Sequence, residues 1–245
     1  MGEKIECSGC GKEFERLGMH WAFNDECVPE LSQKQKEICN GIMMGDAWIE
    51  TTHKNARMCI SVITEEYLEY LHKIFYPITT GVKLKESFQK RLERRPSSLP
   101  GETVEKASDL YRLQTRTHPY FNRYNQWYSD GDKTFPVNIE LTPTTLKHWF
   151  VCDGCFQMAN GTTPYLTLGM ANEIGNQEKI RKYFDDIDIE IGSFNIGWRS
   201  DSTKNMAAIF NKESTLKMFN YMGEALPGFE YKFPQKYGGE TEVFQ

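Results

Sequence analysis

Four potential metal ligands lie close together near the start of the chain. Cys7 and Cys10 are two residues apart, and His20 and Cys27 follow, giving the spacing C-x2-C-x9-H-x6-C. Zinc prefers four tetrahedral nitrogen and sulfur ligands, and a turn with two thiols combined with two later ligands supplies such a set. We therefore expect residues 1–30 to form a zinc-finger-like module in which these four side chains hold a structural Zn²⁺ ion, whose binding organises a small core.

Two apolar segments each carry one carboxylate in what we expect to be the last turn of a helix. The first contains Gly41 and Gly45 and ends at Asp46, and the second ends at Asp153-Gly154. A carboxylate is unfavourable at the C-terminus of a helix because the helix dipole is already negative there, so a cation is expected nearby. Gly41 and Gly45 would allow close approach of a second helix, and such packing would bring the two aspartates together.

The elements expected around these acids occur twice in the same order, as apolar periodicity and turn residues indicate. The first set comprises a helix over 31–45, strands over 47–52 and 57–63, a helix over 65–75, strands over 82–85 and 110–115, and a helix over 119–128. The second set comprises a helix over 142–153, strands over 157–160 and 164–169, a helix over 177–187, strands over 189–196 and 206–211, and a helix over 213–225. A repeat of about one hundred residues predicts an α+β fold with two pseudo-twofold-related αββαββα subdomains, 31–136 and 137–245.

Composition restricts the class of protein. The chain has 245 residues, of which 39% are hydrophobic and 13% aromatic, which is typical of a globular protein rather than a disordered one. No apolar run approaches the length of a membrane span, and the polar residues 1–6 do not resemble a signal peptide. We therefore expect an intracellular, cytoplasmic protein with no membrane partner and with reduced thiols. Under this interpretation Cys152 and Cys155 are core thiols.

Charge is distributed unevenly along the chain. The formal net charge of −5 argues weakly against a nucleic-acid partner, but residues 81–124 contain an excess of basic over acidic side chains. Such a local basic surface is what a DNA-binding protein uses to contact phosphates. For residues 86–106, a solvated charged loop is the simpler explanation.

The two acid-bearing segments resemble the paired LAGLIDADG motifs of single-chain, intron-encoded homing endonucleases. Gly41, Gly45 and Asp46 match the consensus in the first copy, and Asp153-Gly154 matches it in the second. The resemblance covers the chain from about residue 31 onward and includes residues 111–119 and 141–150. Ala47 departs from the usual glycine, and His148 departs from the usual small residue.

The resemblance implies a hydrolase that cuts both strands of a long, asymmetric double-stranded DNA target during intron homing, as a monomer. Antiparallel strands of both subdomains would form a saddle in the major groove, and Asp46 and Asp153 would hold catalytic Mg²⁺. The family often places a lysine or glutamine near each metal; Lys133 and Lys204 are the candidates, and both are equally well explained as surface lysines. The residues expected to contact DNA are Lys83, Lys85, Arg112, Gln114, Arg116 and Arg199.

Other functions stay open. The same scaffold could serve as an RNA maturase or a transcriptional regulator that binds without cleaving, although the presence of both acids favours the endonuclease. A zinc-dependent hydrolase needs three protein ligands and an open coordination position, whereas the N-terminal set supplies four ligands. The zinc module itself either adds DNA contacts beyond the saddle or acts only as a structural cap.

Overall fold

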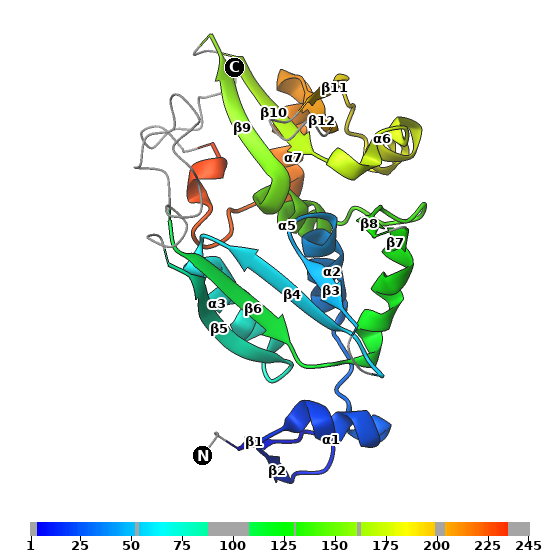
Figure 1. The fold of residues 1–245 in the computed structure, drawn as a ribbon. Coiled ribbons are helices and arrows are strands. Elements are labelled where there is room, and N and C mark those ends of the chain that lie inside the picture. Colours follow the sequence, from blue (N-terminus) through cyan, green and yellow to red (C-terminus); the bar gives the residue numbers. More distant parts are fainter. Residues whose placement is uncertain are drawn as a thin grey trace. The chain divides into compact units, whose positions relative to one another are not determined.

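The computed structural model describes residues 4–51, 54–87, 108–129, 131–160, 163–198 and 204–234. The chain divides into two compact units. Figure 1 shows the elements, coloured along the sequence. One unit contains Met1–Gln35 and Asp46–Asn125, and the other contains Lys36–Gly45 and Gln126–Gln245. None of the helices within the described ranges is long and apolar enough to cross a membrane.

The N-terminal segment of the first unit is a hairpin followed by short helices. Strands β1 (Ile5–Glu6) and β2 (Glu13–Phe14) pair antiparallel, and α1 (Leu17–Phe23) and the 3-10 helix η1 (Asp25–Cys27) follow. Leu17 and Trp21 of α1 are buried, and the Trp21 ring meets His118 edge-on at 6.3 Å. The other side of His118 is fixed by Pro29, whose carbonyl oxygen lies 2.9 Å from its Nε2 atom. These contacts pack the segment onto the remainder of the unit.

A four-stranded antiparallel sheet forms the body of the first unit. Its strands are β3 (Trp48–Glu50), β4 (Arg57–Val62), β5 (Thr79–Glu86) and β6 (Leu110–Thr115), in the order β3-β4-β6-β5. Side chains of a strand alternate between faces, so Met58, Ile60 and Val62 of β4 are buried on one side. Helix α3 (Glu65–Phe75) covers β5 and β6 on this side, with Leu68 and Leu71 buried (Figure 1).

The second unit repeats this arrangement. Its sheet has the order β11-β12-β10-β9, so both sheets place their first, second, fourth and third strands side by side. Alternate residues of the central strands β10 and β12, among them Leu166, Leu168 and Ala208, are fully buried. The elements of this repeat are α5 (Pro143–Asp153), β9 (Gly154–Ala159), β10 (Thr163–Gly169), α6 (Gln177–Asp185), β11 (Ser193–Trp198), β12 (Lys204–Phe210) and α7 (Lys212–Met222).

The repeated topology confirms the predicted α+β fold with two αββαββα halves and antiparallel sheets. The first half opens with α2 (Gln33–Met44), and the predicted helix at 119–128 is the 3-10 helix η3 (Pro119–Trp127). Short elements connect the halves, namely β7 (Tyr128–Ser129) and β8 (Asp132–Lys133); η4 (Ala171–Glu173) lies between β10 and α6, and η5 (Glu230–Lys232) follows the second half. The interpretation of Cys155 as a core thiol is wrong, because β9 presents it on the exposed side of an edge strand.

Helices α2 and α5 approach closely within the second unit. A Cβ atom placed on Gly41 would lie 2.4 Å from the carbonyl oxygen of Thr145 and 2.7 Å from the Cβ of His148, and one on Gly45 would lie 2.3 Å from the Cβ of Cys152. The Thr145 hydroxyl of α5 donates to the Glu37 carbonyl of α2 at 3.2 Å and links the two helices. The two glycines therefore provide the close approach expected from their spacing, and Gly41 makes the room that the buried His148 occupies.

Gly41→Ala is expected to lower the free energy of unfolding by about 1–3 kcal/mol, because the added methyl group must displace the Thr145 backbone. The direction of the change is informative, because replacing glycine by alanine in an unobstructed helix would raise the free energy of unfolding by up to about 1 kcal/mol. Urea unfolding of the variant measures the change. Gly197→Ala is the control, because no atom of the described residues lies within 4 Å of a Cβ at that position. Equal stability of the two variants would contradict the close packing.

Candidate active site and nucleic-acid interface

Asp153 is the last residue of α5 and is exposed at the edge of a cavity of about 450 Å³. Gly45, Lys133 and Asn205 also line this cavity. A Cβ on Gly45 would lie 3.5 Å from an Oδ2 of Asp153, so the carboxylate stands beside the end of α2. Asp46 is the next residue in the chain after Gly45 and is exposed in the first unit.

Lys133 brings a cation to the end of α2. Its ammonium donates to the carbonyl oxygen of Gly45 at 2.5 Å, and its own carbonyl accepts from Asn172 at 3.2 Å. The last carbonyls of a helix lack intrahelical partners and carry the negative end of the dipole. The lysine satisfies one of them, which supplies at α2 the cation expected from the sequence. The structure therefore brings Lys133 and Asp153 into one cavity.

A second lysine occupies the equivalent place at the end of α5. The Lys232 ammonium donates to the carbonyl oxygens of Val151 and Gly154 at 2.7 and 3.0 Å, one on either side of Asp153. Phe233 anchors this segment by meeting Phe150 of α5 at 5.4 Å between ring centroids. Sequence reasoning missed Lys232, because the segment that carries it has no periodicity and lies far along the chain from α5.

Buried Glu173 fixes another wall of the cavity. It forms an ion pair with Lys179 at 2.6 Å and accepts from the backbone N–H of Phe135 at 2.5 Å and from Asn176 at 3.0 Å. These partners compensate for the desolvation of the carboxylate. Glu173 therefore holds the loop after Lys133 in place rather than offering a free ligand.

Lys204 and Asn205 start strand β12 and, as neighbours in a strand, project to opposite faces. The cavity is lined by Asn205, whereas Lys204 is exposed at the strand end. The assignment of Lys204 as an auxiliary catalytic residue stays a prediction. Asn205 was missed, because one asparagine on a strand is indistinguishable in sequence from an ordinary polar residue.

The side chains around the cavity suit a hard divalent cation. Asp153, Asn172 and Asn205 line it with carboxylate and amide groups, and Mg²⁺ favours such oxygen ligands while retaining water and binding substrate phosphates. Glu173 is already held by its ion pair and hydrogen bonds, so Asp153 is the remaining carboxylate of this lining. A metal ion bound to Asp153 would therefore keep coordination positions for water and phosphate.

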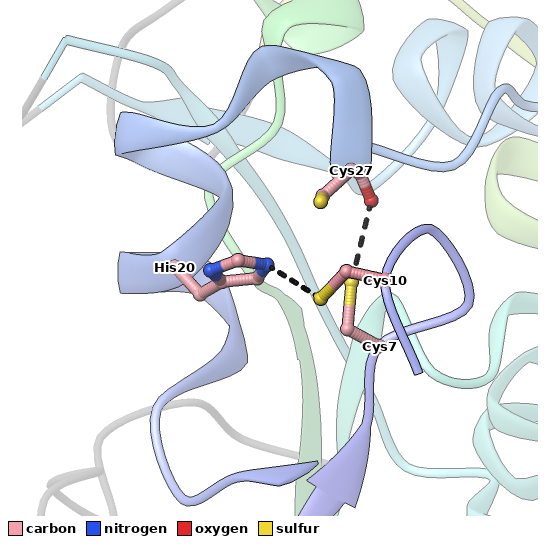
Figure 2. Close-up of side chains that lie close together, drawn as sticks. All are labelled: Cys7, Cys10, His20 and Cys27. Carbon is pink, nitrogen blue, oxygen red and sulfur yellow. Dashed lines mark hydrogen bonds between the residues drawn. The ribbon is translucent and has the colours of Figure 1, made fainter. Parts of the chain in front are cut away.

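The four N-terminal candidate ligands converge as their spacing predicts. One ligand atom from each of Cys7, Cys10, His20 and Cys27 lies within 4.8 Å of the others, and Figure 2 shows the four side chains directed toward one another. The His20 Nε2 atom lies 3.5 Å from the Cys10 sulfur, while Phe14 stacks on the imidazole at 3.9 Å. A Cβ on Gly9 would lie 2.7 Å from the Cα of Cys27, so this turn requires glycine.

The cysteines have unequal tendencies to ionise. Burial disfavours the Cys7 thiolate, but hydrogen bonds from the backbone of Cys10 and Gly9 and from the Cys10 and Trp21 side chains outweigh it and lower its pKa to about 6. Burial, followed by the nearby Cys10 and Cys7 sulfurs, raises the pKa of Cys27 to about 11. The set of three sulfurs and one imidazole nitrogen is the donor chemistry that Zn²⁺ prefers.

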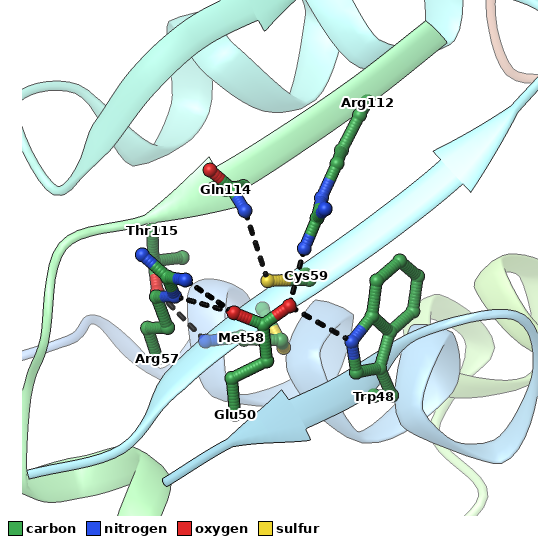
Figure 3. Close-up of polar contacts among 8 residues, drawn as sticks. All are labelled: Trp48, Glu50, Arg57, Met58, Cys59, Arg112, Gln114 and Thr115. Atoms are coloured by element: carbon green, nitrogen blue, oxygen red, sulfur yellow. Dashed lines mark hydrogen bonds and ion pairs between the residues drawn. The ribbon is translucent and has the colours of Figure 1, made fainter. Parts of the chain in front are cut away.

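A polar cluster occupies the face of the first sheet opposite α3. It consists of Trp48, Glu50, Arg57, Arg112 and Gln114 from strands β3, β4 and β6, and is called the Glu50 cluster below (Figure 3). One carboxylate oxygen of Glu50 accepts from Nε of Arg57 at 2.7 Å and from its Nη2. The other accepts from Nη2 of Arg112 and from the Trp48 indole at 3.3 Å. A single carboxylate therefore bridges two guanidinium groups.

Two further contacts fix Arg112. Its guanidinium carbon lies 5.0 Å from the centre of the Trp48 ring, a cation–π distance. The Gln114 amide is assigned with its oxygen toward Arg112, accepting from Nε at 3.0 Å and Nη2 at 2.8 Å, because the alternative would oppose two donors. Partial burial disfavours the charged form of Glu50, but the arginines and Trp48 outweigh it, and the pKa of Glu50 lies below its ordinary value.

The other predicted DNA contacts are placed differently. Lys83 is exposed and pairs across the sheet with Arg112, and the Lys85 ammonium lies 5.6 Å from the centre of the Trp48 ring. Arg116 is directed elsewhere, since its Nε donates to the Pro77 carbonyl at 3.0 Å. Arg199 lies outside the described residues.

The corresponding face of the second sheet is uncharged along its described central strands. Tyr165, Thr167 and Asn205 alternate with the buried residues of β10 and β12, and the Tyr165 hydroxyl donates to Gln157 of β9. The two sheets thus share a topology but differ in surface chemistry.

Comparison with known proteins identifies relatives of the chain. A family model described as the LAGLIDADG DNA endonuclease family matches residues 36–217. An uncharacterized protein of Methanocaldococcus jannaschii is 26% identical over 132 residues, which cover 54% of this chain and 47% of that protein. The chain therefore matches about half the length of this curated relative.

Two solved structures are similar to the chain, and the first of them shares its fold. The homing endonuclease I-WcaI, bound to its DNA recognition sequence, matches with a TM-score of 0.61 and 18% identity, covering 83% of this chain and 87% of that one. The LAGLIDADG homing endonuclease I-GzeII, in complex with its DNA target, matches with a TM-score of 0.48 and 10% identity, covering 82% and 87%.

Lys232→Met is expected to lower the free energy of unfolding by about 2 kcal/mol, because two helix-end carbonyls lose a charged donor while the aliphatic stem is kept. Hydrogen exchange should also quicken in residues 151–155. Lys217→Met is the control, since this lysine makes exposed ion pairs with Asp188 and Glu213 and a longer contact, of 3.4 Å, with the Asp188 carbonyl oxygen. If both variants behaved like the parent, the Lys232 contacts would not stabilise the end of α5.

Proposed function

Because the chain belongs to the LAGLIDADG DNA endonuclease family, we propose that it is a sequence-specific, metal-dependent endonuclease that hydrolyses both strands of a long DNA target. One observation carries this proposal: the first motif helix packs closely on the second, which ends at Asp153, and Asp153 shares its cavity with Lys133 and Asn205. Both motifs lie in one chain, so we propose that a monomer is sufficient for cutting.

Asp46 and Asp153 are the proposed ligands for catalytic Mg²⁺. When bound, a divalent ion supplies a water of lowered pKa and neutralises charge on the phosphate and the leaving oxygen. The two carboxylates would fix the position of the metal ion and therefore of its positive charge. Lys133 is held at the cavity by the Gly45 carbonyl and is suited to steady negative charge on the scissile phosphate. Asn205 is suited to orient a water molecule through its amide.

The face of the first sheet that carries the Glu50 cluster is the proposed DNA interface of the first half. Arg112 and Gln114 have the donors and acceptors that read base edges in the major groove, and the exposed Lys83 and Lys85 suit phosphate contacts. In the second half, the uncharged face of β10 and β12 would contact the bases of DNA. It would make fewer phosphate contacts than the face of the first sheet. Arg116, Arg199 and Lys204 stay predictions.

Residues 1–30 are proposed to bind one structural Zn²⁺ through Cys7, Cys10, His20 and Cys27. The support is the convergence of four donor atoms of suitable chemistry, with four protein ligands making a closed site rather than a catalytic one. The packing of Trp21 on His118 suggests that the metal also stabilises the attachment of this segment to the first sheet.

Asp153→Asn and Asp46→Asn are each expected to reduce cleavage by about a hundredfold or more, because a neutral amide holds a catalytic cation poorly. Purified protein with Mg²⁺ is incubated with a DNA library, and broken ends are sequenced to find and then quantify the target. The matched control is Asp185→Asn, which alters an exposed aspartate that likewise ends a helix, α6.

The outcomes separate the two candidate functions. Undiminished cutting by both variants would refute the assigned chemistry. Selective DNA or RNA binding by the parent, with no breaks in any divalent metal, would instead indicate a maturase or a regulator.

Metal analysis tests the zinc proposal independently of cleavage. The parent should contain about one equivalent of zinc per chain, and Cys10→Ser should contain far less, because one of four ligands is lost. Cys155→Ser removes another exposed thiol and should keep the full equivalent. Equal zinc content in all three proteins would show that the N-terminal cluster is not the site.

A further inference from the structure

The Glu50 cluster contains an acidic side chain at a surface where contact with DNA would favour basic side chains. DNA carries a dense array of phosphates, so an uncompensated carboxylate on the contact face weakens binding. Glu50 is only 25% exposed and is ion-paired with Arg57 and Arg112, whose side chains are 37% and 24% exposed. The acid therefore removes charge from two side chains that would otherwise be available to phosphates, and such an arrangement calls for a compensating role.

The contacts of Arg112 define its orientation on more than one side. Glu50 accepts from its Nη2 atom, Gln114 accepts from Nε and Nη2, and the centre of the Trp48 ring lies 5.0 Å from the guanidinium carbon. These contacts use the Nε hydrogen and both Nη2 hydrogens of Arg112, so its remaining donors are on the single Nη1 atom and do not form a parallel pair. Arg57 is held by the other oxygen of Glu50 through Nε and one Nη2 hydrogen, so Nη1 and the second Nη2 hydrogen form a parallel pair of donors that these contacts do not use.

A fixed fork suits base recognition more than phosphate binding. Two parallel N–H donors from arginine pair with O6 and N7 of guanine, which is the commonest specific contact in the major groove. Phosphates tolerate many orientations and gain little from such constraint. The rotamer freedom of a long arginine is lost before binding here, so the correct base is favoured by geometry rather than by charge.

We propose that Glu50 is a positioning residue for sequence specificity: it holds Arg57 as a preoriented fork that reads guanine in the major groove, while the ion pair with Arg112 fixes Glu50 itself. The inference rests on the proposed DNA-binding function but not on cleavage. It assigns to Glu50 a role that opposes raw affinity and increases discrimination between sequences.

Binding selection from a random DNA library in EDTA, followed by affinity measurements over a range of salt concentrations, tests the proposal. In Glu50→Gln, the preference for guanine should fall about tenfold at one or two base pairs of the selected site. Affinity for unrelated DNA should rise at the same time, with a salt dependence steeper by about one phosphate contact, because the arginines are released. The matched control is Glu69→Gln, which removes the same charge from an exposed position on α3 and should leave base preference unchanged.

Arg57→Lys provides a second test that keeps the charge but removes the planar fork. It should lose preference at the base pairs affected by Glu50→Gln, so the proposal can be judged even if the Glu50 variant folds poorly. Unchanged base preferences in a folded Glu50→Gln protein, or losses at different base pairs in Arg57→Lys, would overturn the proposal. A parent without any sequence preference would overturn it together with the proposed target recognition. Selective binding without cutting would overturn only the proposed nuclease activity.

Discussion

The contact between α2 and α5 is the constraint on which the candidate site depends. Gly41 and Gly45 remove the side chains that would keep the helices apart, and the resulting approach places the Asp153 carboxylate beside the end of α2. Helices in this position expose the negative ends of their dipoles, where a carboxylate is unfavourable. Lys133 and Lys232 relieve that cost by donating to the carbonyls around each helix end. The site is therefore a balance of close packing, concentrated negative charge and two lysines that compensate for it.

The regular features of the fold could be predicted from the sequence because they depend on local periodicity. The helix ending at Asp153, the strand at Leu110–Thr115 and the repeated order of elements are set by apolar spacing and turn residues. The N-terminal cluster of candidate metal ligands could be predicted for a similar reason, since all four are close in sequence and only their types and spacing had to be read. Gly41 and Gly45 were informative because four-residue spacing places them on one face of a helix.

The remainder of the site required tertiary structure. Lys232 reaches α5 from a distant segment, and Asn205 lines the cavity while its neighbour Lys204 does not. Choosing between such neighbours depends on the face that a strand buries, and a shift of one residue reverses the answer. The Glu50 cluster was also missed, because the basic residues of β6 were considered without the acid that β3 brings to them.

The division of α2 between the two units has a consequence for dissecting the molecule. Lys36–Gly45 packs with the second half, although it precedes the first sheet in the sequence. A fragment starting at residue 137 would lack this helix and would expose the surface of α5 that now faces Gly41 and Gly45. The two sequence repeats are therefore not interchangeable modules: an expressible second half must carry its own copy of the first motif helix, for example through circular permutation.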